Sequence, residues 1–339
     1  MPGQAFDIWA RILKQGIAMG NRIKYEGDKI LDKIVKSVKK LLPRAVQKNW
    51  DLYLLILPVV MYFILFKYLP MFGIQIAFKD FSAKKGIWGS DWVGFKHFIR
   101  FFNNYQFVTL IKNTLGISIV TIVCAFPIPI IFALLLNEVK CKWFKKSIQF
   151  VTFAPHFLST VVVVGMVLSF LAPSTGIINN IIVAFGGEPI YFMTEPSMFK
   201  GIYVISGIWQ HMGFDAIIYI AALSGIDMEL YEAAAIDGAN NFKRLLHITI
   251  PALIPTATIM LIRQFGSIMD VGFEKVFLMQ NDLNRASSSV ISTYVYEMGI
   301  SGSQFSFSTA VGLFNAIINF VLIIIVNKTA KKLSNTSLW

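Results

Sequence analysis

The chain has 339 residues, of which 55% are hydrophobic and only 15% are charged, and its mean hydropathy is +0.62. A soluble surface requires roughly 25% charged residues, so this composition argues against a soluble globular protein. The net charge of +12 would suit a nucleic-acid-binding protein, but the basic residues flank apolar stretches and leave no separate basic domain. Two cysteines, Cys124 and Cys141, are too few and too poorly placed for a disulfide framework or a metal site.

The first segment, residues 1–49, is a basic leader. Between residues 29 and 42, apolar side chains recur at helical spacing with lysines between them, and Pro43 ends the run. This pattern predicts an amphipathic helix on the inner membrane face, which anchors and orients the chain; a regulatory role is the alternative. The leader has no continuous apolar core, so we expect the first membrane span to act as the targeting signal.

Six apolar stretches follow that are long enough to cross a bilayer as helices. They cover residues 52–73, 110–136, 150–171, 201–223, 250–269 and 309–326. The sequence therefore predicts an all-α membrane protein, with a six-helix domain at 50–328 and a tail at 329–339. The fifth stretch carries two prolines and several polar residues, which are tolerated where a membrane helix faces protein or an aqueous path.

Most of the 31 Lys and Arg residues lie before the first span, in the second and fourth connecting loops, or after the sixth span. Since cytoplasmic loops carry this excess, both termini are predicted to be cytoplasmic. Of the outer segments, 79–105 is rich in aromatic residues, and we expect an interfacial belt or a partly folded piece. The stretch 177–185 is apolar but too short to span, which favours a re-entrant or interfacial piece.

The loop 224–251, between the fourth and fifth spans, is predicted to be cytoplasmic. Strong helix formers surround Glu232, Gly238 can end that helix, and Asn240 or Asn241 can cap a second one. Two short helices at an angle would form a compact knob that fits a groove of a partner, with Glu232 and Asp237 as charged contacts. An ordinary helical loop is the alternative.

The same loop resembles the EAA motif of permease subunits of bacterial ABC importers. Glu232-Ala233-Ala234 is followed after three residues by Gly238, and after nine more by Ile248-x-Ile250-Pro251, with Ile250 where leucine is usual. The Asp237-Gly238-Ala239 version is similar to carbohydrate importers related to the maltose permeases. Further stretches at 50–58, 66–80, 272–276, 293–296, 307–313 and 337–339 resemble the LplB-type polysaccharide permeases.

This resemblance implies a type I importer in the bacterial cell membrane, with two different six-helix permeases, two ATPases and an extracellular substrate-binding lipoprotein. The chain would be one permease that moves oligosaccharides by alternating access. It would bind no cofactor itself, since ATP and Mg²⁺ belong to the ATPases, and no Gly-x-x-x-x-Gly-Lys-Ser/Thr motif occurs in it. The resemblance assigns coupling to the ATPase to Glu232, Ala233, Ala234, Asp237, Gly238 and Ala239.

A sugar is bound by hydrogen bonds and aromatic stacking, so polar and aromatic residues within apolar spans are candidates for its path. These candidates are Trp209, Gln210, His211, Phe214, Asp215, Arg263, Gln264, Ser267 and Asp270. Arg263 and Asp270 can instead neutralise each other or pair with a second permease. Trp209 and Tyr219 can serve in packing, and Asn315 and Asn319 can hydrogen-bond between helices.

The guanidinium of Arg263 suits a carboxylate, so uronate-containing oligosaccharides are a specific hypothesis for the cargo. Two alternatives remain: a secondary transporter driven by an ion gradient, and an ABC permease for a solute other than sugar. A membrane enzyme is disfavoured because the span ends hold no acid–base pair or metal cluster.

Overall fold

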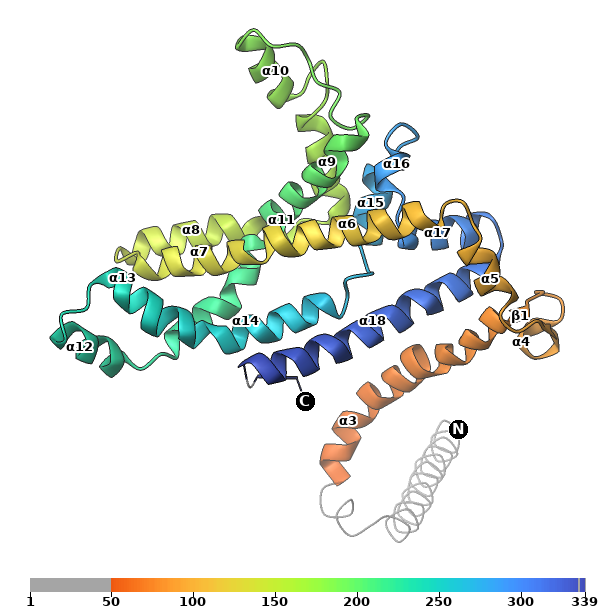
Figure 1. Ribbon diagram of the computed structural model, residues 1–339, viewed down its shortest axis with the longest axis horizontal. Helices are drawn as coiled ribbons and strands as arrows, with labels where there is room; N and C mark the ends of the chain where they lie inside the picture. Colours follow the sequence, from red (N-terminus) through yellow and green to blue (C-terminus); the bar gives the residue numbers. More distant parts are fainter. Residues whose placement is uncertain (1–49, 335, 339) are drawn as a thin grey trace, which may run out of the picture. The chain divides into compact units, whose positions relative to one another are not determined.

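The computed structural model describes residues 50–334 and 336–338, and the predicted leader helix at 1–49 lies outside them. The chain divides between Gly73 and Ile74 into two compact units. Its described part is helical apart from a single two-stranded sheet (Figure 1). The fold class predicted from the composition is therefore confirmed.

The first unit contains the first predicted span. Helix α3 (Trp50–Phe63) continues through a π-helical turn (Ile64–Tyr68) into a 3-10 segment (Leu69–Phe78), which crosses into the second unit. The helical run Asp51–Phe78 has 28 residues and is long and apolar enough to cross a membrane. Pro58 lies within α3, and its missing N–H is tolerated as it is in other membrane helices.

The aromatic outer segment is folded. It comprises β1 (Lys79–Asp80), α4 (Gly86–Gly89), β2 (Asp91–Trp92) and α5 (Lys96–Phe102). The strands pair antiparallel, and the Trp92 ring stacks on that of Phe78 at 5.9 Å. Lys96 donates a 2.6 Å hydrogen bond to Asp80, which holds the pKa of that carboxyl below its usual range. Of the two predictions for this segment, the partly folded piece is the one observed.

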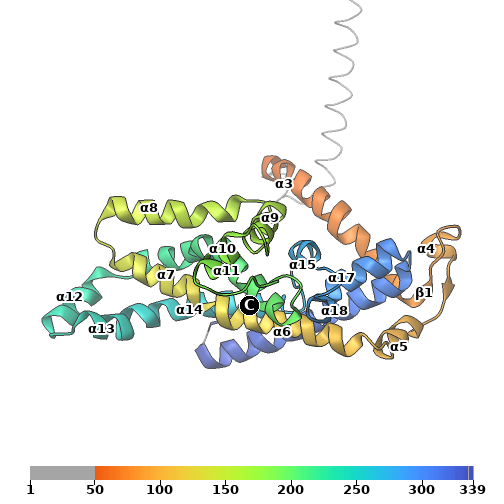
Figure 2. The same ribbon diagram turned by 90° about the horizontal axis from the view of Figure 1, so that it is seen from above.

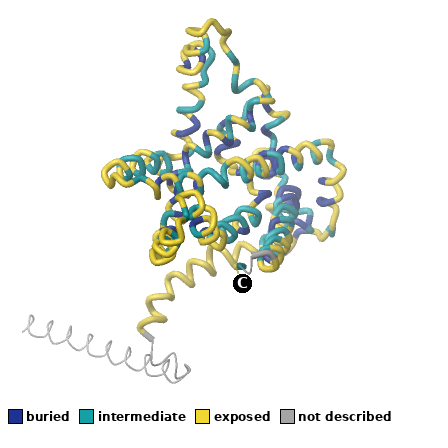
Figure 3. Tube along the Cα trace, turned by 60° about the vertical axis from the view of Figure 1, so that its left-hand side comes forward, coloured by how far each residue is buried: buried dark blue, intermediate teal, exposed yellow. Residues whose placement is uncertain are grey.

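Long helices form the body of the second unit. They are α6 (Phe107–Ala125), α7 (Pro127–Glu138), α11 (Pro196–Ser224), α14 (Ile250–Phe265) and α18 (Phe305–Ser334). Helix α11 packs against α6, α7 and α14, and α14 packs against α18 (Figures 1 and 2). Buried residues gather where these helices meet (Figure 3). Of the side chains predicted for the substrate path, Gln210 is buried among these helices, whereas Arg263, Ser267 and Asp270 are exposed in the isolated chain.

Within the described residues, four helices are long and apolar enough to span a membrane: Asp51–Phe78, Phe107–Glu138, Asn241–Phe265 and Phe305–Lys332. The fourth predicted span corresponds to α11, which is 29 residues long but carries more polar residues. The fifth predicted span ends early, because α14 stops at Phe265. The sixth extends further than expected, since α18 continues to Ser334 into the predicted tail. The count of six spans stays a prediction.

The third predicted span, 150–171, is wrong as a continuous helix. Helix α8 (Lys142–Phe153) and a 3-10 turn (Ala154–Phe157) meet α9 (Thr160–Phe170) at 102°. Pro155 in that turn has no N–H to continue the ladder. Ser159 then starts a new helix, because its hydroxyl accepts a hydrogen bond from the Val162 amide. The hydropathy of the stretch did not show that Pro155 and Ser159 interrupt the helix.

Short helices complete the unit. They are α10 (Ile177–Ala184), α12 (Met228–Ile236), α13 (Asn241–Arg244), α15 (Phe273–Met279), α16 (Arg285–Ser288) and α17 (Ile291–Tyr296), with π-helical turns at Leu245–Thr249 and Glu297–Ser301. Figures 1 and 2 place α12 and α13 at one end of the second unit and β1 and α4 at the other. Helix α15 packs against α9, and α17 against α18.

Candidate functional site

The loop between α11 and α14 has the two short helices expected from its sequence. Asp227 caps α12 by accepting a 3.0 Å hydrogen bond from the Glu229 amide. The helix ends before Gly238, whose φ of +76° is readily adopted only by glycine. The amides of Gly238 and Ala239 donate to the carbonyls of Ala235 and Ala234, which is a Schellman ending. The prediction that Gly238 stops the helix is confirmed.

The second helix of the loop is held to the first. Of the two asparagines considered, Asn240 is the cap of α13, accepting a 2.8 Å hydrogen bond from the Lys243 amide. The Arg244 side chain donates to the Ala239 carbonyl, and the Tyr231 and Thr249 hydroxyls are 2.9 Å apart. These contacts fix the angle between α12 and α13 and join both to the start of α14.

The surface of this loop is largely uncovered in the isolated chain. Glu232 and Asp237 are exposed, as are four large apolar side chains, Met228, Leu230, Ile236 and Phe242. Ile236 has 88% of its surface exposed and Phe242 has 69%. We call 227–244 the coupling loop, after the role that the sequence predicts for it. Apolar groups grouped in this way on a rigid helix pair are typical of a surface that another protein covers.

The polar residues of the spans line three neighbouring cavities. The Arg263 cavity, of about 440 Å³, is lined by Phe126, Pro129, Phe214, Asp215, Ile217, Ile218, Tyr219, Met260, Arg263 and Gln264. The Asp270 cavity, of about 170 Å³, has Ser267, Asp270 and Tyr203 among its lining residues. The Lys275 cavity, of about 190 Å³, includes His211, Asp215 and Lys275. Gln264 lines all three, so we treat them as one candidate substrate path.

Helical spacing explains which side chains reach this path. On α11, Tyr203, Gly207, His211 and Asp215 recur every four residues and therefore share a face. On α6 and α7, Thr121, Ala125 and Pro129 follow the same interval along the opposite wall. Trp209 and Gln210 do not belong to the α11 face, and neither lines the three cavities. Gln210 is buried and donates to the Leu158 carbonyl, which ties α11 to the bend before α9.

Several predicted residues have local partners. Ser267 donates to carbonyls of its own preceding turn. His211 hydrogen-bonds His156 through their Nδ1 atoms at 3.1 Å, and the His156 ring stacks on Phe214 with centroids 3.7 Å apart. Gln264 differs from these, because its side-chain oxygen is buried without a hydrogen-bond partner. Such an atom is a group that a passing hydroxyl can satisfy.

Asp270 does not pair with Arg263. Its two carboxylate oxygens accept hydrogen bonds from Asn315 at 2.7 Å and from Asn319 at 2.9 Å. Asn319 in turn accepts from the Met269 amide. The interhelical role considered for the two asparagines is therefore observed, and Asp270 holds the end of α14 against α18.

Two cations of the path, Arg263 and Lys275, form no ion pair with a described carboxylate. In the described part of the chain, ion pairs involve Lys85, Lys96, His97 and Arg285. Arg263 is exposed in the Arg263 cavity, and Lys275 is buried beside the Lys275 cavity. Sequence reasoning missed Lys275 because it lies outside the predicted spans. A lone lysine before the apolar run Val276–Met279 was the available signal.

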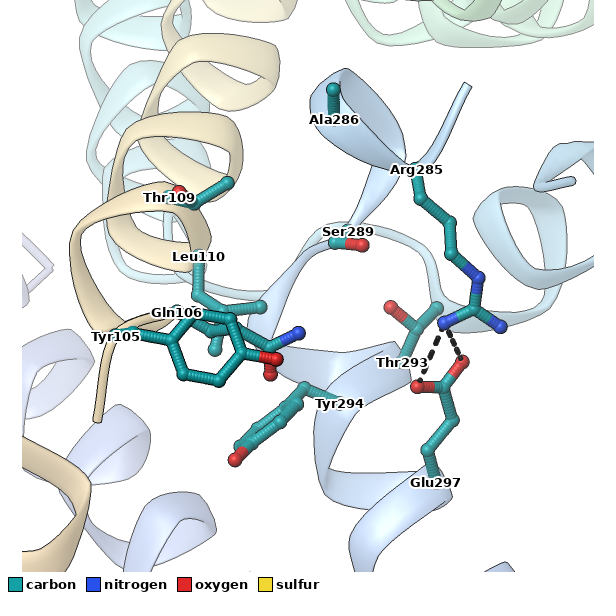
Figure 4. A pocket seen from close by; sticks show the side chains of 10 residues that line it. All are labelled: Tyr105, Gln106, Thr109, Leu110, Arg285, Ala286, Ser289, Thr293, Tyr294 and Glu297. Carbon is teal, nitrogen blue, oxygen red and sulfur yellow. Dashed lines mark hydrogen bonds and ion pairs between the residues drawn. The ribbon is translucent and has the colours of Figure 1, made fainter. Parts of the chain in front are cut away.

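A fourth cavity, of about 230 Å³, lies between the start of α6 and the helices α16 and α17. Figure 4 shows its lining, with Tyr105 and Gln106 on one side and Arg285 facing Glu297 on the other. The Arg285 side chain contacts both Glu297 oxygens and also Asp282. The hydrogen bond to Glu297 raises the pKa of Arg285 further above its ordinary value. This arginine is thus already neutralised by two carboxylates.

Comparison with known proteins gives consistent matches. Residues 125–335 match the family model described as binding-protein-dependent transport system inner membrane component. The chain is 44% identical over 89% of its length to the polygalacturonan/rhamnogalacturonan transport system permease protein YteP of Bacillus subtilis, covering 94% of that protein. It is also 44% identical to protein LplB of the same organism, over 87% of this chain and 93% of LplB.

Two solved structures of bacterial ABC transporters are also similar to this chain. One is a bacterial ABC transporter involved in the import of the acidic polysaccharide alginate; its matching chain has a TM-score of 0.80 and 39% identity, over 86% of this chain and 98% of that one. A second structure shows a bacterial alginate ABC transporter in complex with an alginate pentasaccharide-bound periplasmic protein. Its TM-score is 0.81 at 38% identity, over 87% and 99% of the two chains.

Proposed function

The chain belongs to the family of binding-protein-dependent transport system inner membrane components, and on this premise we propose that it conducts acidic oligosaccharides across the bacterial cell membrane. It is a permease subunit of an ABC importer of oligosaccharides. The observation that carries the acidic cargo is Arg263, an exposed cation in the largest cavity of the path that forms no ion pair with a described carboxylate. A guanidinium binds a uronate carboxylate through two parallel hydrogen bonds.

The other groups of the Arg263 cavity suit a sugar. Phe214, which is 39% exposed, offers a ring against which a pyranose can pack, and Gln264 offers an amide to its hydroxyls. Tyr219 is buried in the core and contributes packing, the alternative considered for it. Asp215 lines the same cavity and limits its positive charge, so that an acidic sugar is bound weakly enough to move on. The named substrates of the relatives, polygalacturonan, rhamnogalacturonan and alginate, support this choice.

The working assembly contains more than this chain. We infer a second homologous permease, two ATPases that hold ATP and Mg²⁺, and an extracellular binding protein that delivers the sugar. The periplasmic protein bound in the alginate transporter supports the last of these partners. Arg263, Ser267 and Asp270 are exposed in the isolated chain, which fits a surface that the second permease covers.

The cargo proposal is tested by uptake into liposomes that contain the full complex, with its binding protein supplied outside. Oligogalacturonate, oligoalginate and a neutral malto-oligosaccharide serve as substrates. We expect uptake of an acidic oligosaccharide, and Arg263→Gln should lower its rate by about tenfold, the value of one charged hydrogen bond. Lys112→Gln, a change on α6 outside the three cavities, is the matched control. Unchanged uptake by Arg263→Gln would refute the role of Arg263.

The coupling loop is the second part of the proposal. We infer that α12, Gly238 and α13 dock in a groove of the ATPase, so that closure of the ATPases moves α11 and α14 and opens the path outward. Three features support it: the Schellman ending at Gly238, the asparagine cap, and the exposed apolar side chains around Glu232. Residues 232–239 would provide most of the contact.

ATP hydrolysis stimulated by sugar tests this docking. Gly238→Pro removes the amide that bonds to Ala235 and cannot adopt positive φ, so stimulated hydrolysis should fall to the unstimulated level. Glu232→Ala, which removes only an exposed charge, should also lower the sugar-stimulated hydrolysis, by a smaller amount. The control is Gly225→Ala, just before the coupling loop, where a Cβ meets its nearest atom at an ordinary 3.5 Å. Normal stimulation in both loop variants would exclude the docking assignment.

A further inference from the structure

Lys275 is a buried cation without a carboxylate partner. Its side chain on α15 is 9% exposed, and no ion pair of the described residues includes it. The ammonium donates one hydrogen bond, of 2.9 Å, to the Tyr203 carbonyl, and lies 4.7 Å from the centre of the Tyr203 ring. A lysine ammonium has three donors. Burying it with two of them unused is costly unless another group binds there.

The Lys275 cavity holds further unsatisfied polar atoms. The Thr121 hydroxyl oxygen and the Gln264 side-chain oxygen both line it, and both are buried without a hydrogen-bond partner. Gly207 on α11 keeps the space open, since a Cβ there would lie 3.3 Å from the Lys275 nitrogen. A cation, a hydroxyl and an amide from three different helices thus surround one cavity.

None of the charged groups near Lys275 forms an ion pair with it. Asp215 and His211 also line the cavity, but Asp215 is shared with the Arg263 cavity and makes no ion pair with Lys275. Arg285 provides the contrast, because Asp282 and Glu297 already bind it in the pocket of Figure 4. Of these two cations, Lys275 is the one that can accept a carboxylate from elsewhere.

We propose that Lys275 binds a carboxylate of the transported oligosaccharide, while Thr121 and Gln264 hydrogen-bond its hydroxyls. This assignment rests on the acidic cargo proposed above. The Lys275 and Arg263 cavities share Pro129, Asp215 and Gln264 among their lining residues, so the two cations lie along one path. Each then binds an acidic unit of one chain as it moves inward.

The test compares uptake of oligogalacturonate by the reconstituted full complex in four forms: wild type, Lys275→Gln, Lys275→Arg and Lys200→Gln. Glutamine keeps a donor for the Tyr203 carbonyl but loses the charge, so uptake at limiting substrate should fall roughly tenfold or more. Arginine keeps the charge and should restore most of the rate. Lys200 lies on α11 in a different cavity, and its variant should match wild type. Unstimulated ATP hydrolysis reports assembly and should stay the same in all four.

Each other outcome has a distinct meaning. If wild type takes up oligogalacturonate and Lys275→Gln does so equally well, the role of Lys275 is refuted while the acidic cargo stands. If wild type takes up only the neutral malto-oligosaccharide, both proposals fail together. If Lys275→Gln and Lys275→Arg both lose unstimulated hydrolysis as well as uptake, Lys275 serves in packing and the inference is overturned.

Discussion

Individual polar residues beside the three cavities divide into those that join helices and those that keep unused hydrogen-bonding groups. Asp270 belongs to the first kind, because Asn315 and Asn319 of α18 occupy both its oxygens. Gln264, Arg263 and Lys275 belong to the second kind, since each retains hydrogen-bonding capacity beside a cavity. We therefore expect polar residues with protein partners to contribute to stability and those without to contribute to transport.

Replacing Asp270 by alanine should destabilise the protein by about 1–2 kcal/mol, since two asparagine amides lose their acceptor between packed helices. Thermal unfolding of the purified complex in detergent measures this as a lower Tm. The control is Asp282→Ala, which removes a carboxylate that is 96% exposed and pairs with Arg285; such surface pairs contribute about 0–1 kcal/mol. Equal shifts for the two variants would contradict the joining role of Asp270.

The charge of Lys275 predicts a pH dependence of uptake. Burial lowers the pKa of Lys275 to about 8, so the ammonium is charged below this pH and becomes neutral as the pH rises through it. Uptake of oligogalacturonate by wild type should therefore decline above that pH. Lys275→Arg stays charged and leaves the other titratable groups of the cavity, Tyr203, His211 and Asp215, in place. A decline of the same size in both proteins would show that the pH dependence comes from a group other than Lys275.

At the scale of elements, the bend between α8 and α9 determines how α11 is packed. Helix α8 lies against α11 at Gly213, where a Cβ would collide with the Thr152 carbonyl. Small residues permit such close approach of membrane helices. Gln210, one turn earlier on α11, bonds to Leu158 within the bend. The broken segment thus supports the helix that carries much of the path.

Gly213→Ala should therefore disturb this contact and cost about 1–3 kcal/mol, as overpacking does. Gly201→Ala is the matched control on the same helix, because a Cβ at Gly201 meets nothing within 4 Å. Thermal unfolding of the two complexes gives the comparison. If Gly213→Ala were as stable as Gly201→Ala, α8 and α11 would not be in close contact.

Sequence reasoning succeeded where residue identity fixes local geometry. Gly238 correctly predicted where α12 ends, because a positive φ is a local requirement. Asn240, one of two asparagines considered, marks where α13 begins, because a capping side chain is also a local requirement. It failed at 154–159, where the hydropathy did not show the break, and it did not indicate Lys275, whose hydrogen bond to Tyr203 joins segments far apart in the sequence. An interhelical role for Asn315 and Asn319 was one of the alternatives, but the sequence did not indicate Asp270 as their partner, because that contact joins distant segments.

For the whole molecule, the arrangement of the second unit fits transport between two compartments. The coupling loop lies at one end and the small sheet at the other (Figures 1 and 2). Residues of α6, α7, α11 and α14 line the three cavities. Movement of the coupling loop can therefore be transmitted through α11 and α14 to the walls of the path. This arrangement is suited to transport that is driven by a partner that binds ATP.

The most direct test is the energy source of uptake. The full complex is reconstituted in liposomes with ATP enclosed, and with the binding protein and oligogalacturonate outside. The account predicts uptake that requires ATP hydrolysis and the binding protein and is unaffected by proton or sodium ionophores. Uptake that continues without ATP and collapses with an ionophore would instead identify an ion-driven carrier and contradict the account.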